Sequence, residues 1–327
     1  MTDQRVAVLC GGVGAARFLR GLLGVVDPTD VVAIVNTGDD TELHGLAISP
    51  DLDTITYTLA DAIDPERGWG LAGETWRAMA ALERYSEVRP DGSAAAPRWF
   101  NLGDTDLATH FYRTARLAEG ASLSEVSAEI AHAWGLGLTM LPMTDDRCRT
   151  MVTVVDDGEP CEITFQDYFV RLRHSVPVTA VRFDHDGARP TTAVLDAIGT
   201  AAAVVIAPSN PLVSIGPIRT LPGIDEALGR RRESVVAVSP IVGGAALKGP
   251  ADRMLRELGL DASVAAIARL YAPIAATLVV DEADADHVDA IEAAGMRCVV
   301  TPTVMSQPGV AAALAHTCLV AAGAHRS

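Results

Sequence analysis

The sequence predicts an α/β protein: a Rossmann-like, doubly wound, mostly parallel sheet with a helical and β-hairpin insertion that forms a second lobe. Three observations predict this fold. Short runs of uninterrupted apolar residues alternate with stretches of helical period, which is typical of buried parallel strands joined by crossover helices. A glycine-rich turn directly follows the first run. The middle of the chain departs from this alternation and indicates an insertion.

The predicted strands of the core are apolar over almost their whole length, as strands buried on both faces usually are. They span residues 5–10, 31–36, 203–207, 235–239, 277–280 and 298–301. The stretches around them repeat apolar residues at helical spacing. These predicted helices span residues 18–25, 222–230, 250–258, 284–294 and 306–322.

The middle of the chain has a different character. Residues 54–86 and 104–134 are predicted to be mostly helical, and a polar loop rich in Pro, Gly and Ala covers 86–98. Alternating runs at 150–155 and 161–165 flank a turn at 156–160, which predicts a β-hairpin. We therefore expect a nucleotide-binding core of residues 1–53 plus 184–327, interrupted by an insertion lobe of residues 54–183.

Charge and composition exclude several classes of partner. The 327 residues include 26 Lys and Arg against 42 Asp and Glu, a net charge of −16, so nucleic acid and anionic membrane surfaces would be repelled. No apolar run is long enough to span a membrane, and the first residues resemble no secretory signal, so we expect a cytoplasmic protein. Five widely spaced cysteines without a C-x-x-C pair indicate reduced thiols.

The turn after the first strand, residues 11–17, is a candidate phosphate cradle. Gly12 and Gly14 would let the backbone approach an anion at the start of a helix, although a tight strand–helix turn explains the same glycines. A P-loop is excluded because no Gly-Lys-Ser/Thr follows. Arg17 at the last small position, and Asn36 where a ribose-binding acid would stand, disfavour a dinucleotide site.

Four carboxylates follow the second predicted strand, Asp39 and Asp40 first and then Asp51 and Asp53. They lie at the edge of the sheet where ligands of open α/β folds bind. Paired carboxylates beside a nucleotide phosphate suit Mg²⁺, which keeps several waters and phosphate oxygens as ligands. Helix capping by Asp51 or Asp53, and a solvated turn at 39–40, are the alternatives.

Two later loops carry small polar groups and a cation. Prolines 208 and 211 bracket Ser209 and Asn210 after the strand at 203–207, a rigid arrangement whose hydroxyl, amide and N–H groups suit a nucleotide. Lys248, the chain's single lysine, stands in the glycine-rich loop 240–250. A compact ammonium there would suit a phosphate, and chance retention at the surface is the alternative.

Taken together and in order, these loops resemble one family. The motifs are Gly-Gly-Val-Gly, Asn-Thr-Gly-Asp-Asp, Ser-Pro-Asp-Leu-Asp-Thr, Leu-Gly-Asp-x-Asp with Ala-Thr-His, Leu-Pro-Met-Thr-Asp-Asp, Phe-Gln-Asp-Tyr-Phe, Pro-Ser-Asn-Pro-Leu-Val-Ser-Ile-Gly-Pro-Ile and Ser-Pro-Ile-Val-Gly-Gly. They are similar to the 2-phospho-L-lactate transferase family of coenzyme F-420 biosynthesis, from about residue 5 to residue 320.

The resemblance implies a Mg²⁺-dependent, homodimeric transferase. It would move a phospholactyl or phosphoenolpyruvyl group from a guanosine diphosphate ester to the ribityl hydroxyl of the deazaflavin Fo and release GMP. The arginine- and alanine-rich composition is typical of actinobacteria, whose branch of the family uses the enolpyruvyl donor.

The resemblance also implies roles for particular residues. Asp53 would face the Fo ribityl chain or its metal as a catalytic group, and Asp40 would be a second catalytic or metal-binding carboxylate. Asn101 stands where the family often has a basic residue, so only a neutral hydrogen bond to Fo is expected there. Leu102 and Gly103 would lie beside Fo, and the guanosine phosphate end would be lined by Gly12, Gly14, Ser209, Asn210 and Ser214.

Two other function classes compete with the transferase. A sister family of non-enzymatic regulators, which bind a nucleotide sugar, shares the Gly-Gly-x-Gly start and the acidic loops. The Leu-Pro-Met-Thr-Asp-Asp and Phe-Gln-Asp-Tyr-Phe motifs favour the transferase branch. A dinucleotide-dependent oxidoreductase is disfavoured by Arg17 and Asn36, as noted above.

Overall fold

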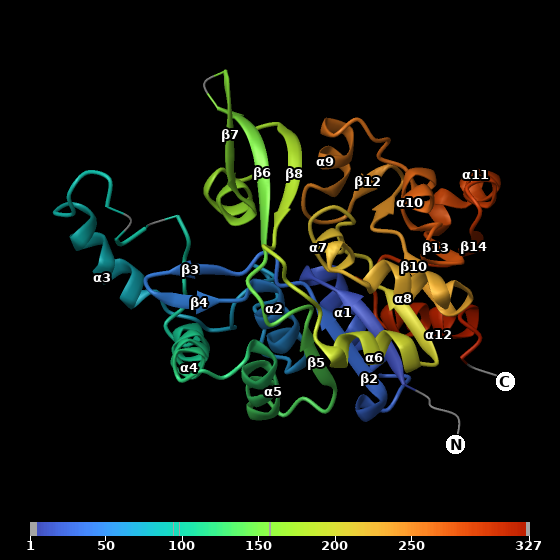
Figure 1. The fold of residues 1–327 in the computed structure, drawn as a ribbon, viewed down its shortest axis with the longest axis horizontal. Helices are drawn as coiled ribbons and strands as arrows, with labels where there is room; N and C mark the ends of the chain where they lie inside the picture. Colours follow the sequence, from blue (N-terminus) through green and yellow to red (C-terminus); the bar gives the residue numbers. More distant parts are fainter. Residues whose placement is uncertain (1–4, 94, 98, 157, 325–327) are drawn as a thin grey trace.

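A computed structural model of the chain describes residues 5–93, 95–97, 99–156 and 158–324. At its centre is a seven-stranded sheet in which every pair of neighbours is parallel, in the order β14-β13-β10-β9-β1-β2-β5 (Figure 1). Its strands are β1 (Val6–Cys10), β2 (Val31–Val35), β5 (Thr139–Pro142), β9 (Ala203–Ile206), β10 (Val235–Val238), β13 (Thr277–Val280) and β14 (Arg297–Val300).

Helices cover both faces of this sheet because its central strands are apolar on both faces. In β1, Ala7 and Leu9 belong to one hydrophobic cluster, while Val6, Val8 and Cys10 belong to the other. The second cluster takes side chains from α1 (Gly12–Leu22), α2 (Pro50–Leu59) and α12 (Val310–Ala321). The first takes them from α6 (Thr192–Thr200), α7 (Gly216–Thr220), α8 (Ile224–Arg230), α9 (Ala251–Glu257), α10 (Val264–Tyr271) and α11 (Val288–Ala293). The result is the doubly wound arrangement.

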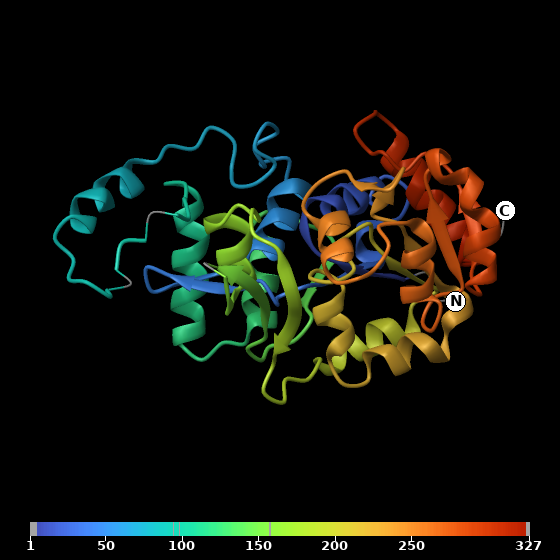
Figure 2. The same cartoon turned by 90° about the horizontal axis from the view of Figure 1, so that it is seen from above.

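The remaining elements extend the molecule to one side of the sheet. They are the hairpin of β3 (Thr41–Leu43) and β4 (Leu46–Ile48), the helices α3 (Arg77–Ser86), α4 (Asp106–Ala118) and α5 (Leu123–Ala133), and an antiparallel sheet of β6 (Arg149–Asp156), β7 (Glu159–Thr164) and β8 (Val178–Asp184). A short hairpin, β11 (Ile241–Val242) with β12 (Ala245–Ala246), precedes α9. Figures 1 and 2 show α3 at one end of the molecule and α11 at the other.

The α/β class, the parallel sheet and the hairpin at 150–165 are confirmed. The expectation that 54–86 is mostly helical holds only at its two ends, in α2 and α3, because 60–76 is irregular and its three glycines at 68, 70 and 73 have positive φ. The helix expected at 18–25 begins at Gly12, since packing of α1 against the sheet outweighs the low helix propensity of its glycines. Ala94, Arg98 and Asp157, within the expected loop and hairpin turn, lie outside the described residues.

The strand β5 is not among the strands expected from the sequence, which placed residues 54–183 in an insertion outside the central sheet. It pairs with β2 at the edge of the central sheet, where a proline costs no hydrogen bond to a further strand. The segment 54–183 therefore returns once to the central sheet. Over the described residues, no helix combines the length and apolar character needed to cross a membrane.

Close packing of α1 against α12 depends on Gly21. A Cβ built at Gly21 clashes with the backbone and side chain of Ala311, so Gly21→Ala should lower stability by about 1–3 kcal/mol, the usual cost of overpacking. The matched control is Gly199→Ala in α6, where nothing lies within 4 Å of the added Cβ and a small gain in stability is expected. Denaturant unfolding measures both. Equal effects of the two substitutions would contradict this packing.

Candidate functional site

The adjacent strands β9, β1 and β2 bring three loops to one edge of the sheet. Their carboxyl ends lead into residues 208–214, 11–14 and 36–40, and ligands of open α/β sheets bind at such an edge. Side-chain hydrogen bonds tie the loops together: the Ser209 hydroxyl donates to the Gly11 carbonyl oxygen at 2.8 Å, and the Asn36 amide donates to the Val213 carbonyl oxygen at 3.5 Å. The early acidic loops and the late small-residue loop therefore meet in one place.

The glycine turn is the point of contact. A Cβ at Gly11 would lie 2.5 Å from Oδ2 of Asp51, and one at Gly14 would lie 2.5 Å from the carbonyl oxygen of Pro208. Gly12 has a φ of +74°, a conformation that favours glycine, and its N–H donates to the Asp51 carboxylate. The glycines therefore allow close approach by neighbouring loops, and a protein carboxylate already accepts from the start of α1.

Three carboxylates at this edge are buried and hold their protons more tightly than usual. Burial raises the pKa of Asp39, Asp40 and Asp51, with mutual repulsion adding to the effect for Asp39. The pKa of Asp51 rises to about 6, although hydrogen bonds from Asn36 and the Gly12 N–H oppose the shift. Asn36 donates to Oδ2 of Asp51 at 2.9 Å. Ser49 donates to Oδ2 of Asp40 at 2.7 Å.

Asp53 differs from these three because a buried cation neutralises it. It lies in the first turn of α2, and both of its oxygens accept from the guanidinium of Arg113 on α4, Oδ1 from one terminal nitrogen and Oδ2 from the other at 3.2 Å. His110, one turn earlier on α4, has Nδ1 3.7 Å from Oδ2 of Asp53. Asp53 is 5% exposed and Arg113 is 2% exposed.

The carboxylate oxygens without a hydrogen-bond partner indicate which kind of metal ion this site could accept. Within the described residues, Oδ1 of Asp39 and Oδ1 of Asp40 are buried and have no hydrogen-bond partner, which suits a hard cation that prefers oxygen ligands. Asp53 keeps spare lone pairs beside its two bonds from Arg113. No group of three or more His, Cys, Asp or Glu side chains forms a metal centre in the described ranges. The residues therefore fit an ion that takes few protein ligands and completes its shell with phosphate and water.

Three of the residues expected to bind the nucleotide, Ser209, Asn210 and Ser214, lie in the loop 208–214. Two of them already make hydrogen bonds to other groups of the protein. Oδ1 of Asn210 accepts from the Leu212 N–H at 2.9 Å, and the Ser209 hydroxyl is bound as described. Ser214 is half-buried, and its Cβ lies 3.1 Å from the position of a Cβ on Gly11. Its hydroxyl makes no hydrogen bond within the described part of the chain, so of these three side chains it is the freest to meet a ligand.

Lys248 reaches across to the insertion. It is exposed, and its Nζ would lie 2.6 Å from a Cβ on Gly68. Partial burial, and then the charge of Arg17 on α1, lower the pKa of Lys248. Lys248 and Arg17 are therefore neighbouring cations, and neither forms an ion pair with an acid among the described residues.

The residues expected near Fo stand on the way into α4. Leu102 is buried in a small cluster with Leu43 and Ile48 of the β3–β4 hairpin. Gly103 has no room for a side chain, because a Cβ there would clash with Glu74. Asn101 is exposed and helps to line a cavity of about 320 Å³ together with Trp76, Met79, Ala80, Leu82, Glu83, Ala96 and Pro97.

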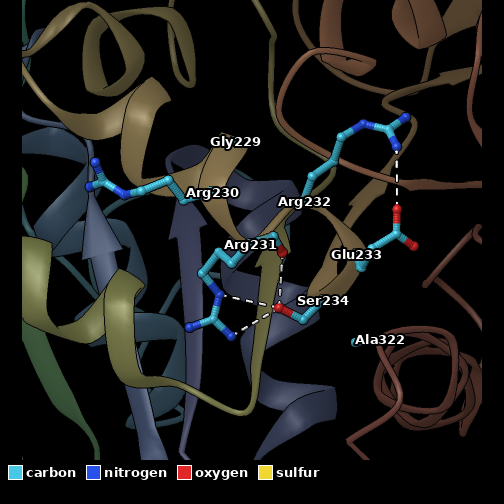
Figure 3. A pocket seen from close by; sticks show the side chains of 7 residues that line it. All are labelled: Gly229, Arg230, Arg231, Arg232, Glu233, Ser234 and Ala322. Carbon is cyan, nitrogen blue, oxygen red and sulfur yellow. Dashed lines mark hydrogen bonds and ion pairs between the residues drawn. The ribbon is translucent and has the colours of Figure 1, made fainter.

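A second cavity, of about 360 Å³, lies before β10, at the other end of the strand from the ligand edge (Figure 3). It is rich in arginine, but Arg231 donates to the carbonyl oxygens of Ile198 and Ala201, and Arg232 to those of Ala272 and Gly295. These guanidinium groups cap helix ends. We assign no site to this cavity.

Several residues of the site were not singled out from the sequence. Asp39 and Asp51 were recognised only as members of an acidic group, and Arg113 and Asn36 were not assigned a role in it. The signal for Asp51 was its place after Pro50 at a helix start, which capping explains equally well. No spacing rule links Arg113 to Asp53, because 60 residues separate them.

A family model described as 2-phospho-L-lactate transferase CofD matches residues 6–315. The chain belongs to the 2-phospho-L-lactate transferase CofD family. The match confirms the resemblance and the transferase class, and small-molecule substrates fit such an enzyme.

Relatives within the CofD family match the chain over nearly its full length. A protein of Kitasatospora aureofaciens named phosphoenolpyruvate transferase is 43% identical over 98% of each chain. A protein of the same name from Streptomyces griseus is 44% identical over 97% of this chain and 98% of its own. A third protein of this name, from Nocardia farcinica, is 42% identical over 98% of this chain and 96% of its own.

Solved structures support the fold. The crystal structure of protein BH3568 from Bacillus halodurans covers 96% of this chain and 99% of its own, with a TM-score of 0.62 and 18% identity. A second structure of that protein, described as a member of the UPF0052 family, has a TM-score of 0.60 and 16% identity. It covers 98% of this chain and 99% of its own. At this identity the likeness shows the fold alone.

The raised pKa of Asp51 makes stability depend on pH. Because the folded-state pKa is about 6 against an ordinary 3.8, the fold favours the protonated acid, and the stability from this group is lost as the pH rises from about 4 to 6. Asp51→Asn should therefore raise the melting temperature relative to wild type at pH 7.5 and change it little at pH 4.

Asp27→Asn is the control of opposite sign. Hydrogen bonds from Thr29 lower the pKa of Asp27, so its contribution is present at neutral pH and is lost as the pH falls below 3.8. Its substitution should lower the melting temperature at pH 7.5 by about as much as at pH 4, and lower it less only at a pH well below 3.8. An effect of Asp51→Asn that is independent of pH would contradict the assignment.

Proposed function

We propose that this chain transfers a phosphoenolpyruvyl, or alternatively a phospholactyl, group from a guanosine diphosphate ester to the terminal ribityl hydroxyl of the deazaflavin Fo in coenzyme F-420 biosynthesis. The observation that carries the proposal is the full-length match to relatives named phosphoenolpyruvate transferase. The meeting of acidic and small-residue loops at one sheet edge supports it. GMP is the second product.

The reaction needs positioning and charge neutralisation more than a reactive side chain. The ribityl oxygen forms a bond to the β-phosphorus of the donor, and the bond from that phosphorus to the oxygen bridging to the α-phosphorus breaks. GMP leaves with the bridging oxygen. The hydroxyl proton passes to a carboxylate, for which Asp53 is the proposed acceptor, with Asp40 beside it.

Mg²⁺ fits this proposal through Asp40 and Asp53. When bound, the ion would neutralise charge on the phosphate oxygens of the donor. The unpartnered Oδ1 of Asp40 supports Asp40 as a ligand, and the fixed orientation of Asp53 supports its approach to the hydroxyl. In the absence of a cation, burial opposes ionisation of Asp40, so this carboxylate gains most from a nearby positive charge.

The donor and acceptor occupy opposite sides of the acidic loops in this proposal. The guanosine diphosphate side is formed by Gly12, Gly14, Ser209, Asn210 and Ser214, together with Lys248, whose charge lies near that of Arg17 on α1. Asn101, Leu102 and Gly103 form the Fo side with Asp53. The hydroxyl of Ser214 and the ammonium of Lys248, which have no acidic partner in the described structure, support the first assignment.

The reaction is tested with Fo and each donor in turn. Mass spectrometry separates the products because the enolpyruvyl product is two hydrogens lighter than the lactyl product, and the enolpyruvyl product is expected. Asp53→Asn should slow transfer by about 10²–10⁴-fold, the usual contribution of a positioned acid or base, with GMP binding nearly unchanged. Near-normal turnover would contradict the role of Asp53.

Fo titration separates the transferase from the competing regulator. The deazaflavin is fluorescent, and a transferase should quench or shift its emission on binding. A protein that binds a nucleotide sugar and not Fo would support the regulator. The homodimer and the cytoplasmic location implied by the resemblance belong to the same proposal, and light scattering tests the dimer.

Magnesium binding has a readout that does not require turnover. Mg²⁺ should raise the melting temperature at pH 7.5, where the buried carboxylates are most in need of a cation, and should raise it less at pH 5, where protons compete. Asp40→Asn should remove most of the gain. Glu42→Gln, at an exposed position of the β3–β4 hairpin, should keep it. Equal stabilisation of all three proteins would exclude Asp40 as a ligand.

A further inference from the structure

We infer that Arg113 is a positioning residue for transfer: from the insertion helix α4 it holds the Asp53 carboxylate in the orientation that the acceptor hydroxyl requires. The inference rests on the proposed function and adds to it a residue that no motif of the sequence singled out. It makes the insertion lobe part of the reacting site, since Asp53 lies on α2 of the core.

The contacts of Arg113 join three elements. Its two terminal nitrogens donate to the two oxygens of Asp53 on α2. The nitrogen that bonds Oδ2 of Asp53 also lies 3.3 Å from the Ala47 carbonyl oxygen on β4. The same nitrogen is 3.3 Å from Nδ1 of His110 on α4. A fork that bonds both oxygens of a carboxylate fixes its plane as well as its position.

The network behind Arg113 limits its movement. Nε2 of His110 is 3.4 Å from Oδ2 of Asp106 on the same helix, and the Tyr57 hydroxyl donates to Oδ1 of Asp106 at 2.5 Å. Tyr57 is one turn after Asp53 on α2. The helices α2 and α4 are therefore linked at two points, one turn apart on α2 and two turns apart on α4, which limits movement of the guanidinium relative to α2.

Burial makes the pairing obligatory. Arg113 is among the largest fully buried side chains of the described structure, and a buried charge without a partner is costly. If Arg113 were absent, Asp53 would be a fourth buried acid beside Asp39, Asp40 and Asp51, with no fork to fix its plane, and repulsion from the other three would favour its rotation. The carboxylate would then lose its fixed orientation.

Arg116 provides a matched control on the same helix. It lies three residues further along α4 and pairs with Glu119 and Glu129, at 2.6 and 2.9 Å, at the partly exposed surface. Its removal changes the charge and surface of α4 without touching Asp53. Arg113→Met and Arg116→Met can therefore be compared directly for melting temperature, Fo affinity, GMP affinity and transfer rate.

Arg113→Met should lower kcat about 100-fold, the usual cost of misplacing a reacting group by about 1 Å, and weaken Fo binding by fluorescence titration. GMP affinity should change less than about threefold, because the nucleotide loops do not contact Arg113. Arg116→Met should leave kcat, Fo affinity and GMP affinity unchanged. Arg113→Lys, which keeps the charge and loses the fork, should recover most of the melting temperature and little of kcat.

A double-mutant cycle with Asp53→Asn decides how Arg113 acts. If Arg113 works through Asp53, Arg113→Met should cost almost nothing further in the Asp53→Asn background. Full additivity would overturn the inference, as would a fall in GMP affinity that parallels the fall in kcat. If Arg113→Met does not fold, Arg113→Lys enters the same cycle. A wild-type protein that neither binds Fo nor transfers from any donor would overturn the proposed function itself, and the inference with it.

Discussion

Four carboxylates buried at one edge of the parallel sheet constrain the loops and helices around them. Asp39, Asp40 and Asp51 are held by hydrogen bonds from neighbouring loops and by protonation at moderately low pH, whereas Asp53 is held by Arg113. Burying such groups without partners would cost several kcal/mol each. A positive charge nearby would offset that cost, and in our proposal a metal ion with the donor phosphates supplies it.

This constraint explains the loops around the cluster. The glycine turn after β1 lets Asp51 approach the backbone, since any side chain at Gly11 would meet the carboxylate. Hydrogen bonds of Ser209 and Asn36 hold the loop after β9 against the loops that follow β1 and β2. Helix α4 contributes the cation, Arg113, that pairs with Asp53. The site therefore joins loops from both halves of the sheet and helix α4, and none of the three forms it alone.

The fold was largely predictable because parallel strands buried on both faces have apolar sequences that depend little on context. The edge strand β5 was not, because its Pro142 resembles a loop residue until the pairing with β2 is known. The acidic site was predictable as a group of nearby carboxylates after β2. The sequence did not predict which of these carboxylates pairs with a cation. The Arg113–Asp53 pair depends on how α4 packs on α2, and periodicity within either helix carries no information about that packing.

Crystals grown with Mn²⁺ and GMP would show whether the acidic loops hold an ion against a nucleotide phosphate, because anomalous scattering locates the ion and ordinary density locates the nucleotide. We expect one manganese peak bonded to Asp40 and to a GMP phosphate, with the nucleotide lying against Ser214 and Lys248 and with Asp53 still held by Arg113. A nucleotide bound elsewhere, such as in the arginine-rich cavity before β10, or a metal far from the carboxylates would contradict it.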